Sequence, residues 1–198
     1  MFVTFEGLDG SGKSTQAELL RARLEVDGLE VVSTREPGGT VLGEQLRDLV
    51  LHGDDVSPWA EALLYAAARA QHVDEVIRPA LERGAAVICD RYLDSSVAYQ
   101  GVGRELGLER VLDLNLAAVG GLLPDRTFLL ALDATEIGRR LSGEHDRLER
   151  ESEDFHARTA AGYRELAARF PERIVVLDAT RTALELAEEV YGALRVRT

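Results

Sequence analysis

One short stretch of the sequence, Gly7-Leu8-Asp9-Gly10-Ser11-Gly12-Lys13-Ser14-Thr15, indicates the fold most directly. It matches the phosphate-binding pattern Gly-x-x-x-x-Gly-Lys-Ser/Thr, which is specific when it follows a strand and opens a helix. In such a P-loop the glycines turn backbone N–H groups toward a phosphate, and the helix N-terminus adds its positive end. Lys13 can then span the β- and γ-phosphates of a nucleotide, while the Ser14 hydroxyl can ligate Mg²⁺. We therefore predict that all nine residues bind a nucleotide.

Short apolar runs alternate with segments of helical period on both sides of this loop. The strand candidates are five runs rich in Val, Ile, Leu or Phe: Phe2 to Phe5, Glu30 to Thr34, Ala85 to Cys89, Thr127 to Leu132 and Arg173 to Leu177. The helix candidates are Lys13 to Val26, Gly43 to Leu51, Pro58 to Arg83, Leu108 to Gly120, Glu136 to Leu141, Glu151 to Phe170 and Ala183 to Arg195. Such alternation predicts an α/β fold, a five-stranded parallel sheet covered by helices on both faces with ligands at the carboxyl ends of its strands. We expect a P-loop NTPase in a single domain spanning residues 1–198.

The composition limits the partners that this protein can have. Its 198 residues include 35 Asp and Glu against 23 Lys and Arg, a formal net charge of −12. A protein that grips nucleic acid or an anionic membrane over a broad surface needs a basic face, so we expect neither partner. The sole cysteine, Cys89, lies in an apolar run, and no run reaches the roughly 20 residues of a membrane span. A cytoplasmic protein with a buried thiol is expected.

Three residues near strand ends point to a metal and to a second anion. Asp90 and Arg91 follow the strand Ala85 to Cys89 directly, and Arg35 lies in the turn-rich segment behind the second strand. Planar guanidinium groups suit bidentate phosphate binding, and both arginines can face the P-loop from the same edge of the sheet. Asp90 is the predicted second ligand of Mg²⁺, directly or through water. The alternatives are a strand-ending cap for Asp90 and surface ion pairs for the arginines.

The long helix predicted from Pro58 carries Tyr65 and Arg69 four residues apart, which places them on one face. Such a pair can stack on a base and hydrogen-bond to it. The alternative interpretation is that Tyr65 belongs to the core and that Arg69 is a solvated charge.

Arginines also gather in a charged segment late in the chain, at about residues 139–151. Arg139, Arg140, Arg147 and Arg150 lie there, around the flexible residue Gly143. The segment is either a solvated connection between helices or a mobile lid that closes over phosphates and supplies arginine to them.

Five segments, in this order, resemble the motif set of bacterial thymidylate kinases, which are P-loop enzymes of the nucleoside monophosphate kinase type. They are the P-loop, Thr34-Arg35-Glu36-Pro37-Gly38-Gly39-Thr40, Tyr65-Ala66-Ala67-Ala68-Arg69, Asp90-Arg91-Tyr92 with Ser95, Ser96, Ala98, Tyr99, Gln100 and Gly101, and Asp146-Arg147-Leu148-Glu149. The resemblance covers essentially the whole chain. It implies transfer of the γ-phosphoryl group of ATP to dTMP, giving ADP and dTDP, with Mg²⁺ as cofactor and a homodimer as the usual assembly.

On the phosphate side, the resemblance implies that Asp9 contacts the sugar 3′-hydroxyl close to the metal. It also implies that Arg91, helped by Arg35, holds the phosphate of the acceptor. Members of the family carry an arginine in the P-loop or supply one from the lid, and this P-loop has none. The lid must then supply it, and we favour Arg140 and Arg147.

On the base and sugar side, the resemblance implies that Arg69 donates to a thymine carbonyl and that Tyr65 stacks on the base. Tyr99 would crowd the 2′ position of the sugar, so that a ribose hydroxyl has neither room nor a partner. Ser96 and Gln100 would lie beside the base and the sugar.

An acceptor phosphate is already anionic at neutral pH, so its phosphorylation needs no general base. The expected catalytic groups, Lys13, Mg²⁺, Arg91 and the lid arginines, align two polyanions and neutralise their charge, while Asp9 orients the acceptor. One alternative is a deoxynucleoside kinase, whose hydroxyl acceptor would need Glu6 or Asp9 as a base. Another is a P-loop nucleotide-binding switch that phosphorylates nothing.

Overall fold

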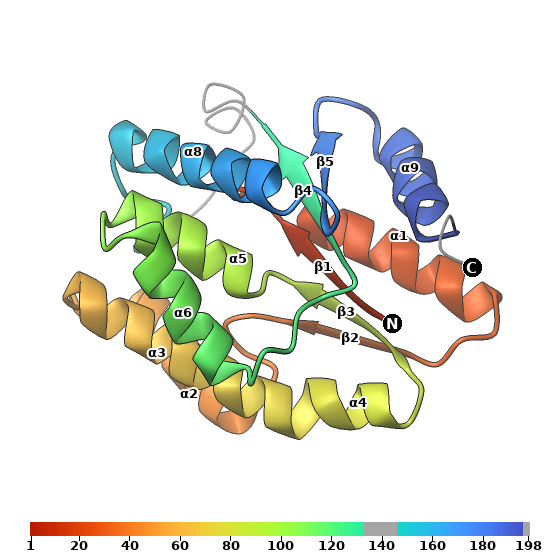
Figure 1. The fold of residues 1–198 in the computed structure, drawn as a ribbon, viewed down its shortest axis with the longest axis horizontal. Helices are drawn as coiled ribbons and strands as arrows, with labels where there is room; N and C mark the ends of the chain where they lie inside the picture. The colour runs from red at the N-terminus through yellow and green to blue at the C-terminus, as the bar shows by residue number, and fades with distance from the viewer. Residues whose placement is uncertain (133–145, 196–198) are drawn as a thin grey trace.

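A central parallel sheet organises the computed structural model, which describes residues 1–132 and 146–195 (Figure 1). Within these residues, five strands pair in the order β2-β3-β1-β4-β5, and the strand before the P-loop lies in the middle. Each strand begins and ends within one residue of its predicted bounds, which confirms the predicted sheet. The strands are β1 (Phe2–Glu6), β2 (Val31–Arg35), β3 (Ala86–Asp90), β4 (Arg126–Ala131) and β5 (Ile174–Asp178).

Helices cover both faces of the sheet, as predicted. α1 (Lys13–Val26) and α9 (Ala183–Arg195) lie together on one face, and α5 (Leu93–Ser96), α6 (Leu108–Ala118) and α8 (Glu153–Arg169) lie on the other (Figure 1). The remaining helical elements, in chain order, are α2 (Val41–His52), α3 (Pro58–His72), the π-helix η1 (Val73–Ile77), α4 (Arg78–Glu82) and the π-helix η2 (Val97–Gly103). Among the described residues, none of these helices combines the length and the apolar character that crossing a membrane requires.

The central strand sends alternate side chains into two different cores. Val3 and Phe5 pack with apolar residues of α1 and α9 on one face of the sheet. Phe2 belongs to the core on the other face, and Thr4 and Glu6 point the same way because side chains of a strand alternate with a period of two. The carboxylate of Glu6 is therefore fully buried, on the face covered by α5 and α8.

The prediction of one regular α-helix from Pro58 to Arg83 is wrong. It consists of α3, the π-helix η1 and α4, and the amide of Arg78 reaches back to the carbonyl of Val73, five residues earlier. The cause is Pro79, since its ring lacks an N–H and clashes with a regular helical ladder. The start of this segment agrees with the prediction, because the Ser57 hydroxyl caps α3 by accepting from the amide of Ala60 at 3.4 Å.

Two helical elements were not predicted, and one predicted helix lies outside the described residues. α5 and η2 form one continuous segment, Leu93–Gly103, that is separated from the end of β3 by two residues and contains two serines and two glycines with no regular apolar period. The predicted helix Glu136 to Leu141 falls between residues 132 and 146 and is not described. The short helix and the π-helix matter for the site, because they carry several of its side chains.

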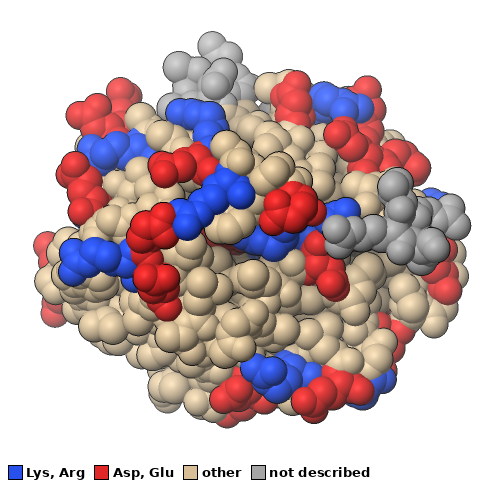
Figure 2. Space-filling view, viewed as in Figure 1, with Lys and Arg blue, Asp and Glu red and all other residues tan. Residues whose placement is uncertain are grey.

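Charged side chains of both signs are mixed over the visible surface. In the view of Figure 2, Lys and Arg side chains lie beside Asp and Glu side chains and do not form a continuous basic face. This distribution agrees with the acidic composition of the chain.

Candidate active site

The P-loop connects β1 to α1 and depends on glycine at its first position. Gly7 has φ +136°, and a Cβ atom there would lie 2.6 Å from the carbonyl oxygen of Leu130 on β4. The side chain of Lys13 folds back over the loop, where Nζ donates to the carbonyl of Leu8 at 2.9 Å. Burial and the nearby charge of Arg91 lower the pKa of Lys13 to about 8. The loop thus holds one desolvated ammonium group at its centre.

Two oxygen atoms meet at the start of α1. The Ser14 hydroxyl donates to Oδ2 of Asp90, at the end of β3, over 2.6 Å. Mg²⁺ prefers oxygen ligands at about 2.1 Å, which places neighbouring ligands about 3 Å apart. A hydroxyl and a carboxylate at this separation fit one edge of a magnesium site. That Ser14 and Asp90 hold Mg²⁺ stays a prediction.

Arg91 lies where the P-loop and the end of β3 meet, in the left-handed backbone region at φ +68°. Its guanidinium group donates to the carbonyl of Gly7 at 2.9 Å and forms an ion pair with Asp9. The Tyr99 hydroxyl donates to the other oxygen of Asp9 at 3.3 Å. Burial opposes the ionisation of Asp9, but the charges of Arg91 and Lys13 outweigh it and hold the pKa of Asp9 below its usual value. Asp9 is therefore a poor proton acceptor at neutral pH.

The buried carboxylate of Glu6 is linked to Arg91 through two hydroxyl groups. Oε2 of Glu6 accepts from the hydroxyls of Ser95, at 2.5 Å, and Tyr163, at 2.9 Å. Nη1 of Arg91 donates to the same two hydroxyl oxygens at 3.2 and 3.3 Å. Oε1 of Glu6 accepts the amide of Tyr92 at 2.7 Å, which satisfies the backbone just after the left-handed turn. Burial and the charge of Asp94 raise the pKa of Glu6 to about 7.

Two cavities meet at Asp9 and Arg91. We call the one over the P-loop the loop cavity; it is lined by Asp9, Gly10, Gly12, Lys13, Ser14, Thr15, Arg35, Glu36, Arg47, Asp90 and Arg91. The second, which we call the inner cavity, is lined by Asp9, Glu36, Pro37, Arg47, Leu51, Tyr65, Arg69, Arg91, Ser95, Ser96, Tyr99, Gln100, Asp146 and Leu148. The free volume inside the inner cavity is about 80 Å³, and the cavity opens to solvent.

The inner cavity brings together side chains that the sequence places far apart. Seven of the eight predicted substrate residues line it: Asp9, Tyr65, Arg69, Arg91, Ser96, Tyr99 and Gln100. The exception is Arg35, which lines the loop cavity, is 54% exposed and forms an ion pair with Glu44. Arg35 is thus placed on the P-loop side of the site.

Arg69 is buried and almost fully engaged by the protein. Its Nε donates to Glu36 at 2.6 Å, one terminal nitrogen contacts Ser96 and Asn115, and the other donates to the carbonyl of Tyr92 at 3.1 Å. Four of its five N–H groups therefore have partners among the described residues. The second hydrogen on Nη2 has no partner among the described residues, and Arg69 lines the inner cavity.

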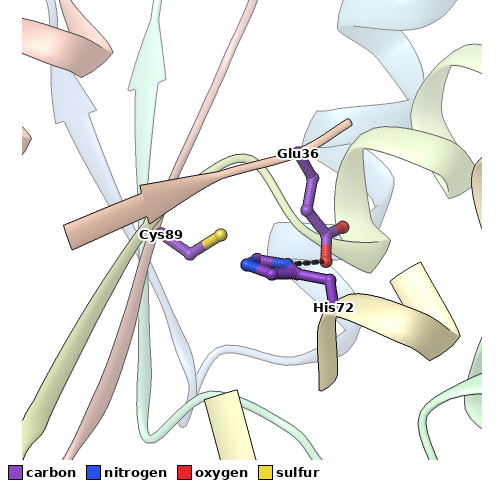
Figure 3. A group of neighbouring side chains, drawn as sticks. All are labelled: Glu36, His72 and Cys89. Carbon is purple, nitrogen blue, oxygen red and sulfur yellow. Dashed lines mark hydrogen bonds and ion pairs between the residues drawn. The ribbon is translucent and has the colours of Figure 1, made fainter. Parts of the chain in front are cut away.

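Glu36 continues this network away from the cavity (Figure 3). Its second oxygen accepts from Nδ1 of His72 at 2.8 Å, and Nε2 of His72 contacts the Thr34 hydroxyl at 2.7 Å. The sulfur of Cys89 points toward the imidazole ring, and burial raises the pKa of this thiol well above its usual value. Glu36, His72 and Cys89 lie close enough to suggest a metal site. Both ring nitrogens are already engaged and Glu36 is paired with Arg69, so the group fits a hydrogen-bond network that positions Arg69.

The two predicted lid arginines have different outcomes. Arg140 lies outside the described residues. Arg147 is half-buried beside the inner cavity, where it donates to the carbonyl of Val50 at 2.8 Å and to Glu61 at 2.7 Å. It does not line the loop cavity. To contact phosphates, as predicted, Arg147 would have to leave Glu61.

Sequence reasoning missed the residues that support this site. Glu6 was considered only as a base, and the roles of Glu36, Glu61, Arg47 and Tyr163 were not predicted. Glu6 and Glu36 did carry a signal, since each is an acidic residue at the carboxyl end of a buried or half-buried strand. No local pattern marked Glu61 or Tyr163, because their partners lie dozens of residues away.

Comparison with known proteins decides the family. The family model described as thymidylate kinase matches residues 5–190. The chain belongs to the thymidylate kinase family. It is 52% identical to a thymidylate kinase of Synechococcus sp. (strain JA-3-3Ab), over all of this chain and 96% of that protein. It is 56% identical to a thymidylate kinase of Leifsonia xyli subsp. xyli (strain CTCB07), over 96% of this chain and 92% of that protein.

A solved structure agrees with this assignment. The crystal structure of thymidylate kinase from Ehrlichia chaffeensis is similar to this chain with a TM-score of 0.81, at 35% sequence identity and over 98% of both chains. The predicted P-loop NTPase fold is thereby confirmed. The thymidylate kinase motifs that the sequence carries in order converge on the two joined cavities, which is where members of a kinase family need a donor and an acceptor to meet.

Proposed function

We propose that this thymidylate kinase family member transfers the γ-phosphoryl group of ATP to dTMP, giving ADP and dTDP. The observation that carries the proposal is the junction of the two cavities at Asp9 and Arg91. One cavity is built around a P-loop, and the other offers aromatic, amide and guanidinium groups for a nucleoside. A donor and an acceptor bound in them would meet with their phosphates at Arg91.

The loop cavity is suited to ATP with Mg²⁺. Lys13 and the backbone N–H groups of Gly7 to Thr15 would hold the β- and γ-phosphates. Ser14 and Asp90 would hold Mg²⁺, directly or through water. When bound, the metal neutralises charge on the donor phosphates.

The inner cavity is suited to dTMP. We propose that Arg91, with Arg35 from the loop side, holds the phosphate of the acceptor, and that the free hydrogen on Arg69 donates to a thymine carbonyl. Tyr65 would stack on the base, and Tyr99 would exclude a ribose 2′-hydroxyl. Ser96 and Gln100 would contact the base and sugar.

The chemistry proposed here is positioning and neutralisation of charge. The attacking oxygen belongs to an anionic phosphate, so the protein has no proton to remove. Asp9 fits an orienting role, since its carboxylate is held ionised between Arg91 and Lys13. We retain Arg140 as the proposed lid arginine that reaches the transferring group. The same role for Arg147 requires that it exchange its contact with Glu61 for the phosphates.

The two alternatives explain less of the site. A deoxynucleoside kinase needs a base near a hydroxyl acceptor, but Asp9 is a poor base and Glu6 is buried behind Arg91. A nucleotide-binding switch has no use for a second cavity lined by Arg69, Tyr99 and Gln100. Neither alternative is favoured by any feature of the described residues.

The direct test is to follow the labelled phosphate. With γ-³²P-ATP, Mg²⁺ and dTMP, we expect the label to appear in dTDP at the rate at which ADP forms. Arg91→Ala is expected to lower kcat/KM for dTMP by at least about a hundredfold while ATP binding persists, because a charged hydrogen-bond partner of the acceptor is lost. Label released only as inorganic phosphate would contradict the proposal.

We also propose that the protein is a cytoplasmic homodimer that binds neither nucleic acid nor membranes. α2 and α3 expose large apolar side chains, among them Leu49 at 45% and Leu63 at 52%, that a partner chain could cover. Light scattering should give the mass of two chains, and Leu63→Arg should shift that mass toward one chain. A monomer at micromolar concentration would contradict the homodimer.

A further inference from the structure

Glu61 is a fully buried carboxylate in the first turn of α3, with no solvent-exposed area and no position in either cavity. Oε1 accepts from Nε2 of Gln100 at 2.8 Å and from Nε of Arg104 at 3.3 Å. Oε2 accepts from Arg104 at 3.1 Å and from Arg147 at 2.7 Å. A buried carboxylate with this many donors is held in one orientation.

The contact with Glu61 decides how the amide of Gln100 is turned. An ionised carboxylate only accepts hydrogen bonds, so the NH₂ group of Gln100 must face Glu61. The carbonyl oxygen, Oε1, is then the amide atom left for the inner cavity, which Gln100 lines while being 2% exposed. Among the described residues, this oxygen has no hydrogen-bond partner of its own. The oxygen is not cut off from solvent, so a water molecule or a ligand in the inner cavity can donate to it.

An unused donor lies on the neighbouring part of the cavity wall. Arg69 contacts the hydroxyl of Ser96, four residues before Gln100, and keeps one hydrogen on Nη2 free of protein partners among the described residues. The cavity wall therefore presents one hydrogen-bond acceptor, from Gln100, and one donor, from Arg69, to a nucleobase. A pyrimidine with an N3–H donor beside a 4-carbonyl acceptor, as in thymine and uracil, is complementary to this pair. Cytosine is not, because its N3 accepts and its 4-amino group donates.

We propose that Glu61 is a positioning residue that sets the choice of base, by turning the carbonyl of Gln100 toward the substrate. The inference rests on the proposed function, since it assumes that a pyrimidine nucleoside monophosphate occupies the inner cavity. Glu61 acts through Gln100 and does not touch the base.

Substitution of Glu61 by glutamine should make the side-chain amide of Gln100 rotate, so that its carbonyl and NH₂ groups exchange places. In Glu61→Gln the new carbonyl oxygen takes the place of Oε2, because two arginine nitrogens donate there at 2.7 and 3.1 Å, and the longer contact of Oε1 with Nε of Arg104, at 3.3 Å, is lost. The new NH₂ group then faces Gln100, which must turn its own carbonyl toward residue 61 and its NH₂ group toward the cavity. That NH₂ group matches N3 of cytosine and opposes the N3–H of thymine.

The test is the ratio of kcat/KM for dTMP to kcat/KM for dCMP. We expect Glu61→Gln to lower this ratio at least tenfold, because the hydrogen bond from N3–H of thymine to Gln100 is lost and two donors then face each other. Arg104→Gln is the matched control, since it disturbs the same buried cluster and leaves the contact between Glu61 and Gln100 in place. Its ratio should stay within about twofold of the parent value. If Glu61→Gln alone fails to fold, the double variant with Arg104→Gln removes one charge of each sign and is used instead.

The outcomes separate the inference from the proposed function. If Glu61→Gln loses activity on dTMP and dCMP in equal proportion, the ratio is unchanged and Glu61 has only a structural role, which overturns the inference. An equal fall of the ratio in Arg104→Gln also overturns it. If the parent protein phosphorylates neither dTMP nor dCMP, the proposed function is wrong, and the inference that rests on it is wrong as well.

Discussion

The position of Arg91 depends on the orientation of two neighbouring hydroxyl groups. The hydroxyls of Ser95 and Tyr163 direct their hydrogens to Glu6, which leaves their oxygens free to accept from Arg91. A hydroxyl hydrogen turned the other way would oppose the guanidinium group. Glu6 therefore orients Arg91 through two residues, although none of the three need touch the acceptor phosphate.

Removal of one hydroxyl tests this arrangement. Tyr163→Phe takes one acceptor from Arg91 and one donor from Glu6, while the ring and its packing remain. We expect kcat/KM for dTMP to fall about tenfold, because the loss of one hydrogen bond to a charged group costs roughly 1.5 kcal/mol. Steady-state kinetics with varied dTMP measure it. The matched control is Tyr92→Phe, whose lost hydroxyl contacts Leu122, away from Arg91; equal losses in both variants would contradict the role of Tyr163.

Glu6 should also make stability depend on pH. Because the pKa of Glu6 is raised to about 7 in the folded protein, the folded state binds a proton between pH 4.5 and 7 that the unfolded state releases. Stability from this group is therefore fully present below about pH 4.5 and is lost as the pH rises through about 7. Urea unfolding of the parent and of Glu6→Gln at pH 5 and pH 7.5 isolates this contribution. The parent should lose up to about 3 kcal/mol relative to the variant over this interval, and a pH-independent difference would be the contrary result.

At the residue scale, the sequence predicts the groups that face the ligand better than the groups that hold them. Arg69, Tyr99 and Gln100 were recognised from motifs and line the inner cavity. Glu36 and Glu61 were not assigned a role, since a carboxylate in a sequence looks the same whether it is solvated or buried. Their burial is decided by partners from other elements, which only the folded chain brings together.

The P-loop is the element on which the donor site depends, and its geometry leaves no room for a side chain at Gly7. Gly7→Ala would place Cβ 2.6 Å from the carbonyl oxygen of Leu130, so the loop must move away from β4. We expect binding of an ATP analogue to weaken at least tenfold, as measured by titration calorimetry, since the backbone N–H groups lose their alignment.

Gly28 gives the matched control for this substitution. It also has a positive φ, +84°, but nothing lies within 4 Å of a Cβ atom placed there. Gly28→Ala should cost about 1–2 kcal/mol of stability from backbone strain alone and leave nucleotide affinity unchanged. If Gly7→Ala binds the analogue as tightly as Gly28→Ala does, the close approach of the loop to β4 is not required.

At the element scale, regular elements were predicted well and irregular ones poorly. The strands are short runs rich in Val, Ile, Leu or Phe, and their observed bounds lie within one residue of the predicted ones. The π-helices η1 and η2 break the period of 3.6 on which helix prediction depends. η2 nevertheless carries Tyr99 and Gln100, so the least regular element is one of those that shape the inner cavity.

For the whole molecule, strand order decides which residues share a site. Because β1 and β3 are neighbours, Phe5 pairs with Asp90, and the P-loop leaves the sheet beside Asp90 and Arg91. The periodicity of the sequence identifies strands but not their neighbours, since these pairs join residues more than 80 positions apart. The ordered thymidylate kinase motifs did predict which distant residues share a site, because the family resemblance assigns them to one substrate-binding site.

The choice of acceptor distinguishes a kinase that phosphorylates a phosphate from one that phosphorylates a hydroxyl, and we expect this protein to phosphorylate a phosphate. The measurement is ADP formation from Mg²⁺-ATP with dTMP, with thymidine and with no acceptor, under identical conditions. Since Arg91 can bind an anionic acceptor and Asp9 is a poor base for a hydroxyl, we predict that dTMP raises the rate at least about a hundredfold over the rate without acceptor, and that thymidine barely changes it. Equal or faster ADP formation with thymidine, or a rate independent of any acceptor, would contradict the account.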